Sequence, residues 1–350
     1  MKILYVAGRE ATYSRTHNVL KALQKQNFAV VGCFPPDKSF KHYPRLILSA
    51  IRHRRHCDVL LVGFYGQLLL PVLRIFFRQP ILFDMYIATC DTMVFDRGVA
   101  RPGSLKAEIY KMSDKLSCRL SQKIVLETHD HIADFAFKFG IPVDKFQRIF
   151  LAVDDELIYP RSRQKSTEKF LVHFHGEFAP FHGVKYILQA ASILRKEAVA
   201  FQIVGKGITY AADRKLADEL NLANVRFYDP VPYTELANQM AQADVCLGIF
   251  GDNERMLRVT TNKVVEALAM AKPLITGRNE PVQELVAHRH SAYLVERADP
   301  AALAEAILEL KNDDALRKRI AENGYRVFKK NCTMDVFGDE LKEVIKSLRR

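Results

Sequence analysis

The stretch Arg258-Val-Thr-Thr-Asn-Lys-Val-Val-Glu-Ala-Leu-Ala-Met-Ala-Lys-Pro-Leu-Ile275 combines a polar loop, a short helix and a strand. The helix carries Lys263 and, three residues on, Glu266. Unpaired N–H groups and partial positive charge at a helix start favour a bound phosphate, and Arg258 and Lys263 add full positive charge. Glu266, one turn inside, is placed to accept hydrogen bonds from sugar hydroxyls. A nucleotide sugar, with its diphosphate and ribose, presents this combination of groups.

Short apolar runs alternate with helical patterns on both sides of this stretch, which is typical of α/β proteins. Strands are predicted at residues 3–6, 29–34, 59–62, 81–83, 124–126, 170–174, 200–204, 225–228, 245–247 and 274–276. Helices are predicted at about 15–26, 45–54, 104–121, 184–196, 211–220, 233–241, 314–328 and 335–348, with further helices beginning near 281 and 300.

A chain of 350 residues is too long for one ordinary core, so we expect two doubly wound, Rossmann-like domains. The first is expected at residues 1–165 and the second at 166–334, with a polar linker over 160–168. A C-terminal helix at about 335–350 is expected to pack back onto the first domain. Because open α/β sheets bind ligands at the carboxyl ends of their strands, we expect the chemistry in a cleft between the domains.

Composition favours a protein of a reducing compartment without a membrane span. The six cysteines show no C-x-x-C pair and no metal-ligand spacing. The longest apolar stretch, residues 68–77, contains Pro71 and Arg74, cannot cross a bilayer, and is predicted to be a buried crossover helix. The N-terminal apolar run is too short for a signal peptide. We therefore expect a cytoplasmic protein.

The net charge of +12 is concentrated in the first half of the chain. Residues 1–165 hold 26 Lys and Arg against 15 Asp and Glu, a net charge of +11. This excess is either ordinary solvated surface or an attraction for an anionic partner, such as the inner face of a membrane or a phosphate-linked acceptor. Nucleic acid is not expected, because the basic residues form no recognisable binding motif.

Motifs in the second half resemble the donor domain of family 4 glycosyltransferases, which have the GT-B fold. They are His175-Gly-Glu-Phe-Ala-Pro-Phe-His-Gly-Val184, Ile203-Val-Gly-Lys-Gly207, Asn224-Val-Arg-Phe227, Ala243-Asp-Val245, Lys263-Val-Val-Glu266 to Pro273, and Glu284-Leu-Val286. The first half is similar more loosely, through its opening strand and loop and through residues 83–97. The resemblance implies transfer of a sugar from a nucleoside-diphosphate sugar, with retention at the anomeric carbon. It implies a glycan, lipid-linked or small-molecule acceptor, and no metal or cofactor beyond the sugar donor.

Three positions depart from the usual pattern of this family. Arg258 stands where many members have the first glutamate of E-x-x-x-x-x-x-x-E, and Glu266 matches the second. Glu177 and His182 replace the arginine and lysine that often follow the first strand of the donor domain. We therefore expect Arg258 and Lys263 to supply the positive charge for the phosphates.

The predicted donor site combines this helix start with two glycine-containing turns. Glycines at 205 and 207 follow a strand and let the backbone approach a ligand closely. The residues predicted to bind the donor diphosphate and sugar are Arg258, Thr261, Asn262, Lys263, Glu266, Gly176, His182, Gly205 and Gly207. The alternatives are that Glu266 is a surface carboxylate paired with Lys263 and that His182 and His175 are structural.

The first half supplies the residues predicted to act on the acceptor. Asp84 ends a strand and Asp91 lies in the loop beyond, where a carboxylate orients or deprotonates an acceptor hydroxyl. The alternative is that these acids cap a helix or pair with Arg97. Gly8, Arg15 and His17, in the polar loop after the first strand and the helix that it opens, are candidates for contact with phosphate or acceptor.

Two other functions fit the same fold. The first is a nucleotide-sugar epimerase, which needs no acceptor. The second is a non-catalytic subunit that binds a nucleotide sugar or a glycan without turnover, which the unusual Arg258 and Glu177 leave open.

Overall fold

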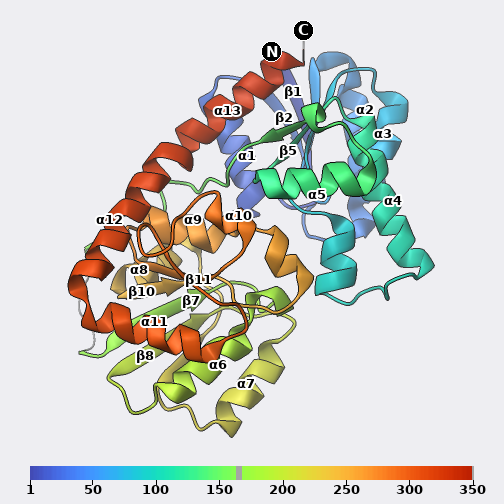
Figure 1. Cartoon of the computed structure of the whole chain (residues 1–350). Helices are drawn as coiled ribbons and strands as arrows, with labels where there is room; N and C mark the ends of the chain where they lie inside the picture. Colours follow the sequence, from blue (N-terminus) through green and yellow to red (C-terminus); the bar gives the residue numbers. More distant parts are fainter. Residues whose placement is uncertain (163–167, 349–350) are drawn as a thin grey trace. The chain divides into compact units, whose positions relative to one another are not determined.

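The computed structural model describes residues 1–162 and 168–348 (Figure 1). The chain forms two compact units. The first contains Met1–Ala152 and the residues from Met334 onward, and the second contains Val153–Thr333. Part of the predicted linker, residues 163–167, lies outside the described residues.

The first unit is built on a six-stranded parallel sheet in the order β2-β1-β3-β4-β5-β6. Its strands are β1 (Lys2–Val6), β2 (Ala29–Cys33), β3 (Val59–Val62), β4 (Ile81–Asp84), β5 (Lys123–Leu126) and β6 (Phe146–Arg148). Every residue of β3 and β4 is buried, because helices cover both faces of the sheet. Its helices are α1 (Ser14–Lys25), α2 (Tyr43–His53), α3 (Leu70–Phe76), α4 (Leu105–Leu120), α5 (His129–Phe139) and α13 (Met334–Ser347).

Alternate residues of β1 serve two different cores, as the period of two in a strand requires. Leu4 and Val6 pack into a core shared with α2, α3 and α5. Ile3 and Tyr5 pack into a core on the other face, shared with α1 and α13. The C-terminal helix α13 therefore completes the hydrophobic core of the first unit.

The second unit repeats this plan with the strand order β12-β11-β10-β7-β8-β9, again all parallel. Its strands are β7 (Phe170–His175), β8 (Val199–Val204), β9 (Val225–Tyr228), β10 (Val245–Leu247), β11 (Leu274–Gly277) and β12 (Tyr293–Val295). Its helices are α6 (Val184–Ile193), α7 (Tyr210–Glu219), α8 (Tyr233–Gln242), α9 (Asn262–Ala269), α10 (Glu280–Gln283), α11 (Pro300–Asn312) and α12 (Asp314–Asn331). Helix α11 packs beside α6, and α9 packs against α12, β10 and β11.

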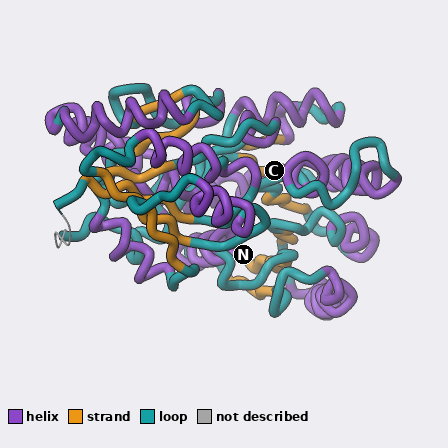
Figure 2. Tube along the Cα trace, turned by 90° about the horizontal axis from the view of Figure 1, so that it is seen from below, coloured by secondary structure: helices purple, strands orange, loops and turns teal. Residues whose placement is uncertain are grey.

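The fold class predicted from the sequence is confirmed. Each unit is a doubly wound parallel sheet, with its helices outside its strands in Figure 2. The structure adds β6, β12 and α5, which were not predicted. Strands β6 and β12 have three residues each.

Residues 68–77 form the predicted helix only in part, as α3, and the helix is not fully buried. Leu70 and Leu73 are buried, whereas Ile75 is 78% exposed. Among the described residues, no helix combines the length and apolar content needed to span a bilayer.

Candidate active site

Helix α9 holds the two charged residues on which the predicted donor site depends. It is almost wholly buried, because its apolar residues pack on β10, β11 and α12. Glu266 is only 3% exposed and Lys263 only 6%. The two lie three residues apart and therefore on one face of the helix. Buried charges of this kind require specific partners.

The Glu266 carboxylate has two direct hydrogen-bond partners. His175 Nε2 lies 2.6 Å from Oε2, and the Tyr233 hydroxyl donates to Oε1. Burial alone would raise the pKa of Glu266, but the interaction with His175 and the hydrogen bond from Tyr233 outweigh it and lower the pKa. Glu266 is therefore ionised at neutral pH. It acts as an acceptor held by His175 and Tyr233, rather than as a surface carboxylate.

Lys263 lies against His182 and Gly176. Its Nζ is 3.1 Å from His182 Nε2, and a Cβ at Gly176 would lie 3.1 Å from the same Nζ. Burial lowers the pKa of Lys263 to about 8, although the nearby Glu266 and Glu177 charges act in the opposite sense. Burial also lowers the pKa of His182 well below its usual value, and the Lys263 charge adds to this. The lysine is thus the cation of the pair and the ring is a neutral acceptor.

The turns after β7 and β8 touch through glycine backbone. A Cβ at Gly205 would overlap the carbonyl oxygen of Gly176, and a Cβ at Gly207 would lie 2.5 Å from the amide nitrogen of Phe178. Gly176 and Gly205 have φ values of 144° and 133°, which side-chain-bearing residues rarely adopt. The turn after β7 and the turn after β8 are therefore in direct main-chain contact.

A cavity of about 250 Å³ opens at these turns. Its walls include His175, Gly176, Gly205, Tyr233 and Glu266. It lies at the carboxyl ends of β7 and β8, where ligands of doubly wound sheets bind. The structure thus brings three of the predicted donor-site residues, Gly176, Gly205 and Glu266, to one cavity.

The start of α9 carries the hydroxyl groups of Thr260 and Thr261. Thr261 precedes the helix, and within the described residues its side chain makes no capping hydrogen bond. The side-chain oxygens of Thr260 and Thr261 are buried, and the described part of the chain provides no hydrogen-bond partner for either. Asn262, the first residue of α9, is half-buried. Such a helix start can receive an anion through its N–H groups and hydroxyls.

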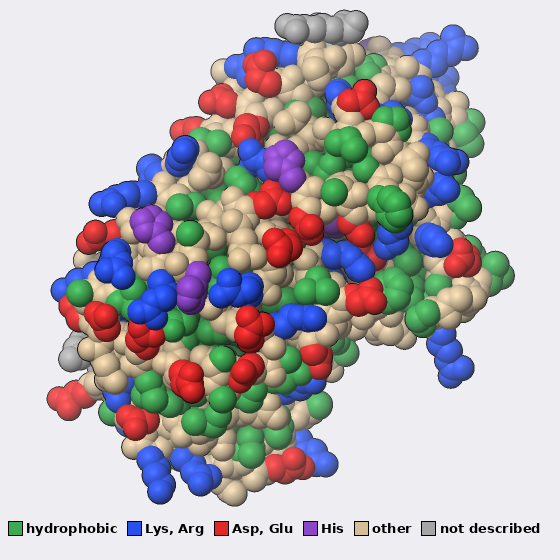
Figure 3. All heavy atoms as spheres, in the orientation of Figure 1, with side chains coloured by type: hydrophobic (Ala, Val, Ile, Leu, Met, Phe, Trp, Pro, Cys, Tyr) green, Lys and Arg blue, Asp and Glu red, His purple; other side chains and the backbone are tan. Residues whose placement is uncertain are grey.

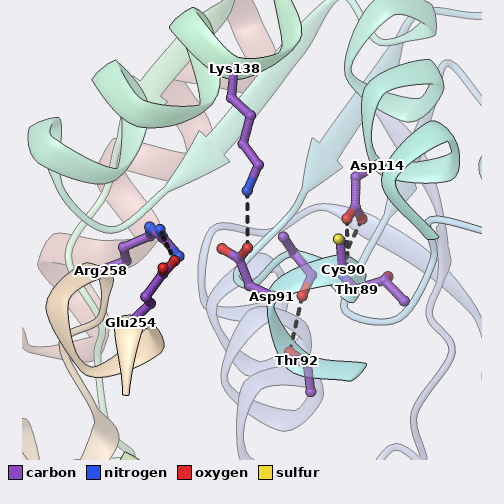
Figure 4. A network of polar contacts seen from close by, with 9 residues as sticks. Thr89, Cys90, Asp91, Thr92, Asp114, Lys138, Glu254 and Arg258 are labelled. Atoms are coloured by element: carbon purple, nitrogen blue, oxygen red, sulfur yellow. Dashed lines mark hydrogen bonds and ion pairs between the residues drawn. The ribbon is translucent and has the colours of Figure 1, made fainter. Parts of the chain in front are cut away.

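The structure pairs Arg258 with Glu254, whose Oε2 lies 2.8 Å from Nη2 (Figure 4). Both belong to a short 3₁₀-helix, η6 (Glu254–Arg258). The arginine whose charge acts on Lys263 and His182 is Arg255. Arg255 is buried and stacks over Phe181, with its guanidinium carbon 4.3 Å from the ring centre. Arg255 was not among the residues predicted for the site. Arg255 lies three residues before Arg258, and residues three apart lie on the same side of a 3₁₀-helix. This spacing of the two arginines was the signal for Arg255.

In the first unit, two residues predicted for different roles are partners of each other. Asp84, at the end of β4, accepts from Arg15 Nε at 3.0 Å and from Nη2 at 2.6 Å. Both side chains are at most 5% exposed. Burial acts to lower the pKa of Arg15, but the Asp84 charge and hydrogen bond outweigh it and raise the pKa. To act as a base, Asp84 would have to share its lone pairs with this guanidinium.

Gly8 and His17 lie on either side of Arg15 in sequence. Gly8 donates its N–H to the Phe64 carbonyl at 2.9 Å, and a Cβ there would overlap the Tyr65 carbonyl. The glycine lets the loops after β1 and β3 approach closely. His17 is half-buried in the first turn of α1.

Asp91 opens a one-turn π-helix, η3 (Asp91–Asp96), which the sequence did not predict. Lys138 from α5 donates to Asp91 Oδ1 at 3.1 Å. On the other side of the loop, the buried Asp114 of α4 accepts from the amides of Thr89 at 3.0 Å and Cys90 at 2.9 Å (Figure 4). Burial raises the pKa of Asp114 to about 7. Hydrogen bonds with α4 and α5 therefore hold the segment that carries Asp91 in place.

Solved structures of similar fold cover nearly the whole chain. A sucrose-phosphate synthase from Thermosynechococcus elongatus matches with a TM-score of 0.82 and 16% identity, covering 99% of each chain. Anabaena HepE in complex with UDP-glucose matches with a TM-score of 0.78 and 15% identity, covering 99% of this chain and 100% of HepE. The two doubly wound units thus define a protein of the GT-B fold.

The family described as glycosyl transferases group 1 matches residues 155–327. This match lies within the second unit, which is therefore similar to this family. A glycosyltransferase of Methanocaldococcus jannaschii is 29% identical over 167 residues, which are 47% of this chain and 45% of that protein. The D-inositol 3-phosphate glycosyltransferase of Corynebacterium glutamicum is 26% identical over 219 residues, 57% of this chain and 51% of that protein. The chain spans about half the length of these curated relatives.

Proposed function

We propose that the chain transfers a sugar from a nucleoside-diphosphate sugar to an acceptor hydroxyl, with retention at the anomeric carbon. The observation that carries this proposal is the cavity at the ends of β7 and β8, with ionised Glu266 in its wall and the Lys263 ammonium beside Gly176. A buried carboxylate suits ribose hydroxyls, and a buried cation with nearby backbone N–H groups suits a diphosphate. Anabaena HepE, which shares the fold, is solved with UDP-glucose, so a donor of this class is the natural first choice.

The chemical work assigned to this site is electrostatic. As the bond between the anomeric carbon and the phosphate oxygen breaks, the electron pair stays with the leaving diphosphate and negative charge grows there. Lys263, Arg258 and the start of α9 at Thr261–Asn262 would hold this charge more strongly than they hold the ground state. The scheme requires no divalent ion. Asp91 and Asp84 are proposed to orient the acceptor hydroxyl or receive its proton.

The test begins with a panel of nucleotide sugars, UDP-glucose first, measured by thermal stabilisation, since a ligand that binds the folded state raises Tm. One donor should raise Tm, and an acceptor should then trigger release of the nucleoside diphosphate. Coupling constants of the product sugar should show the donor's anomeric configuration. Conversion of the donor without acceptor would favour an epimerase, and binding without any turnover would favour a binding subunit.

The proposed acceptor is a glycan, a small molecule or a lipid-linked sugar at the inner face of a membrane. Helix α4 supports the membrane-bound case, because it has an apolar stripe on the side opposite the core. The stripe consists of Leu105, Ile109, Met112 and Leu116, which are 80%, 51%, 58% and 37% exposed. Spacings of four, three and four residues place them on one helix face.

Basic residues flank this stripe. Helix α4 also carries Lys106, Lys111, Lys115 and Arg119. On the face shown in Figure 3, hydrophobic (green) and basic (blue) side chains adjoin along the right-hand edge, over helices of the first unit. Apolar side chains with flanking cations suit a helix that lies in the surface of an anionic bilayer.

Vesicle co-sedimentation tests this surface. We expect the protein to bind vesicles containing phosphatidylglycerol more strongly than phosphatidylcholine vesicles, and Leu105→Gln with Ile109→Gln to weaken that binding. Ile193→Gln, at a 55% exposed position of the second unit, is the matched control. Equal binding by all three proteins would contradict the role of α4.

A further inference from the structure

We infer that His173 and Gln202, which lie behind the cavity, form a hydrogen-bond relay that fixes the orientation and donor–acceptor polarity of the Glu266 site. The relay runs from β8 through both histidines of β7 to α9. Gln202 Nε2 lies 2.8 Å from His173 Nδ1, and His173 Nε2 lies 3.0 Å from His175 Nδ1. His175 Nε2 then lies 2.6 Å from Glu266 Oε2. The inference rests on the proposed donor role of Glu266.

One end of the relay is set by backbone. The same Gln202 amide nitrogen also donates to the carbonyl oxygen of Gln239 at 2.9 Å. A carbonyl oxygen only accepts, so this contact fixes the amide with its NH₂ group toward His173. His173 Nδ1 must therefore accept a hydrogen bond.

This fixed end determines the tautomer of each ring in turn. A neutral imidazole has one donor and one acceptor nitrogen. Because His173 Nδ1 accepts, its Nε2 carries the proton and donates to His175 Nδ1. His175 then carries its own proton on Nε2 and donates to Glu266. Burial lowers the pKa of His173 well below its usual value, which agrees with a neutral ring there.

The sheet holds the members of the relay in register. His173 and His175 are two residues apart on β7 and so point to one face, and Gln202 of β8 is the register partner of His173. His173 is fully buried, and neither His173 nor Gln202 is among the residues that line the cavity. A buried polar chain of this kind is stable only when every member is satisfied. His173 and Gln202 are therefore positioning residues, acting on the donor through His175 and Glu266.

The relay makes a prediction that a merely structural role does not. With Nε2–H of His175 and the Tyr233 hydroxyl both donating to Glu266, the remaining lone pairs of the carboxylate are oriented toward the cavity. Reversing the polarity at Gln202 would reverse both rings. Nε2 of His175 would then face Glu266 without a proton, and the carboxylate would lose its fixed position.

The experiment compares Gln202→Glu with Gln202→Met in the full chain. Both variants remove the bond to the Gln239 carbonyl, but only the glutamate can accept from His173 Nδ1 and reverse the relay. Long-range ¹⁵N–¹H spectra of the rings report the tautomers, with His173→Gln for assignment. We expect Nε2–H on both rings in the wild type. In Gln202→Glu, His173 should carry a proton on Nδ1, and KM for the nucleotide sugar should rise about tenfold beyond that of Gln202→Met. kcat should change less.

Three results would overturn the relay. The first is Nδ1–H on either ring in the wild type. The second is unchanged ring tautomers in Gln202→Glu, and the third is equal KM values for the glutamate and methionine variants. A wild-type protein that binds no nucleotide sugar would instead overturn the proposed function, and the ring spectra would still report whether the relay exists.

Discussion

The Lys263 ammonium lies 3.1 Å from the Nε2 atom of His182, a ring whose burial lowers its pKa well below the usual value. The contact therefore joins a cation to a neutral acceptor and leaves the positive charge unneutralised by it. The Glu266 carboxylate on the same helix face is engaged by His175 and Tyr233. A buried cation in this setting is suited to binding an anionic ligand.

Lys263→Met should separate donor binding from stability. A hydrogen bond from a charged group contributes about 1.5–3 kcal/mol, so KM for the nucleotide sugar should rise about tenfold or more. Tm should stay the same or rise, because the burial penalty of the charge disappears. Thermal melts and initial rates measure both quantities. A variant with wild-type KM would contradict a phosphate-binding role for Lys263.

Donor affinity should fall as pH rises from 7 to 9. Burial lowers the pKa of Lys263 to about 8 in the folded protein, whereas the unfolded value is near 10.5. The cation proposed to bind the diphosphate is therefore lost through pH 8. Over pH 8 to 10.5 the unfolded state binds more protons at this residue, so its contribution to the free energy of unfolding increases with pH. Titration calorimetry at several pH values measures the affinity, and Lys263→Met should flatten both trends.

Glu266→Gln should weaken donor binding while leaving the fold intact. The glutamine side chain has only one acceptor oxygen, so it cannot accept from His175 and Tyr233 at the two positions that the carboxylate offers. It also loses the charge that suits ribose hydroxyls. We expect a loss of about 1.5–3 kcal/mol in donor binding free energy. Glu305→Gln, an exposed position on α11, is the control and should bind as the wild type does. If both variants bind alike, Glu266 does not contact the donor.

Asp84→Asn should destabilise the first unit by about 3–5 kcal/mol, because it leaves the Arg15 guanidinium buried without its counter-charge. The double variant Arg15→Met with Asp84→Leu should recover much of this loss, as measured by urea unfolding. Activity of the double variant decides the role of Asp84. Recovery of stability without activity would assign a catalytic role to the pair, and recovery of both would make it purely structural.

Gly205→Ala should abolish donor binding and lower Tm, because its Cβ would overlap the Gly176 carbonyl at a φ of 133°. Gly103→Ala is the matched control, since Gly103 has a positive φ of 74° and no heavy atom within 4 Å of an added Cβ. The control should cost about 1 kcal/mol from backbone strain alone. Similar losses in both variants would show that the contact with Gly176 has no special effect.

The fold was largely predictable because long buried strands and amphipathic helices leave a strong periodic pattern. The three-residue strands β6 and β12 were not predicted, whereas the equally short β10 was. The π-helix at Asp91–Asp96 was also invisible, because such a turn depends on tertiary contacts to the loop, here those of Asp114 and Lys138.

The site was predictable where a motif carries it and not where side chains meet across the fold. Gly176 and Gly205 were chosen from turns at strand ends, and Lys263 and Glu266 from the short helix that follows a polar loop. Tyr233, however, reaches Glu266 from 33 residues away in sequence, and only the folded β9–α8 connection brings them together. Arg15 and Asp84 were both chosen as candidates, but their mutual pairing over 69 residues was not foreseen.

The contact between Gly176 and Gly205 means that main chain forms the junction of the two turns at the cavity, and main chain offers little to vary. Evolution or engineering of a new sugar preference would then have to work through the side chains around it, such as Lys206, Val231 and Leu236. A library restricted to these three positions should yield altered donors with the scaffold unharmed, whereas randomising the glycines should yield mainly proteins that fail to fold.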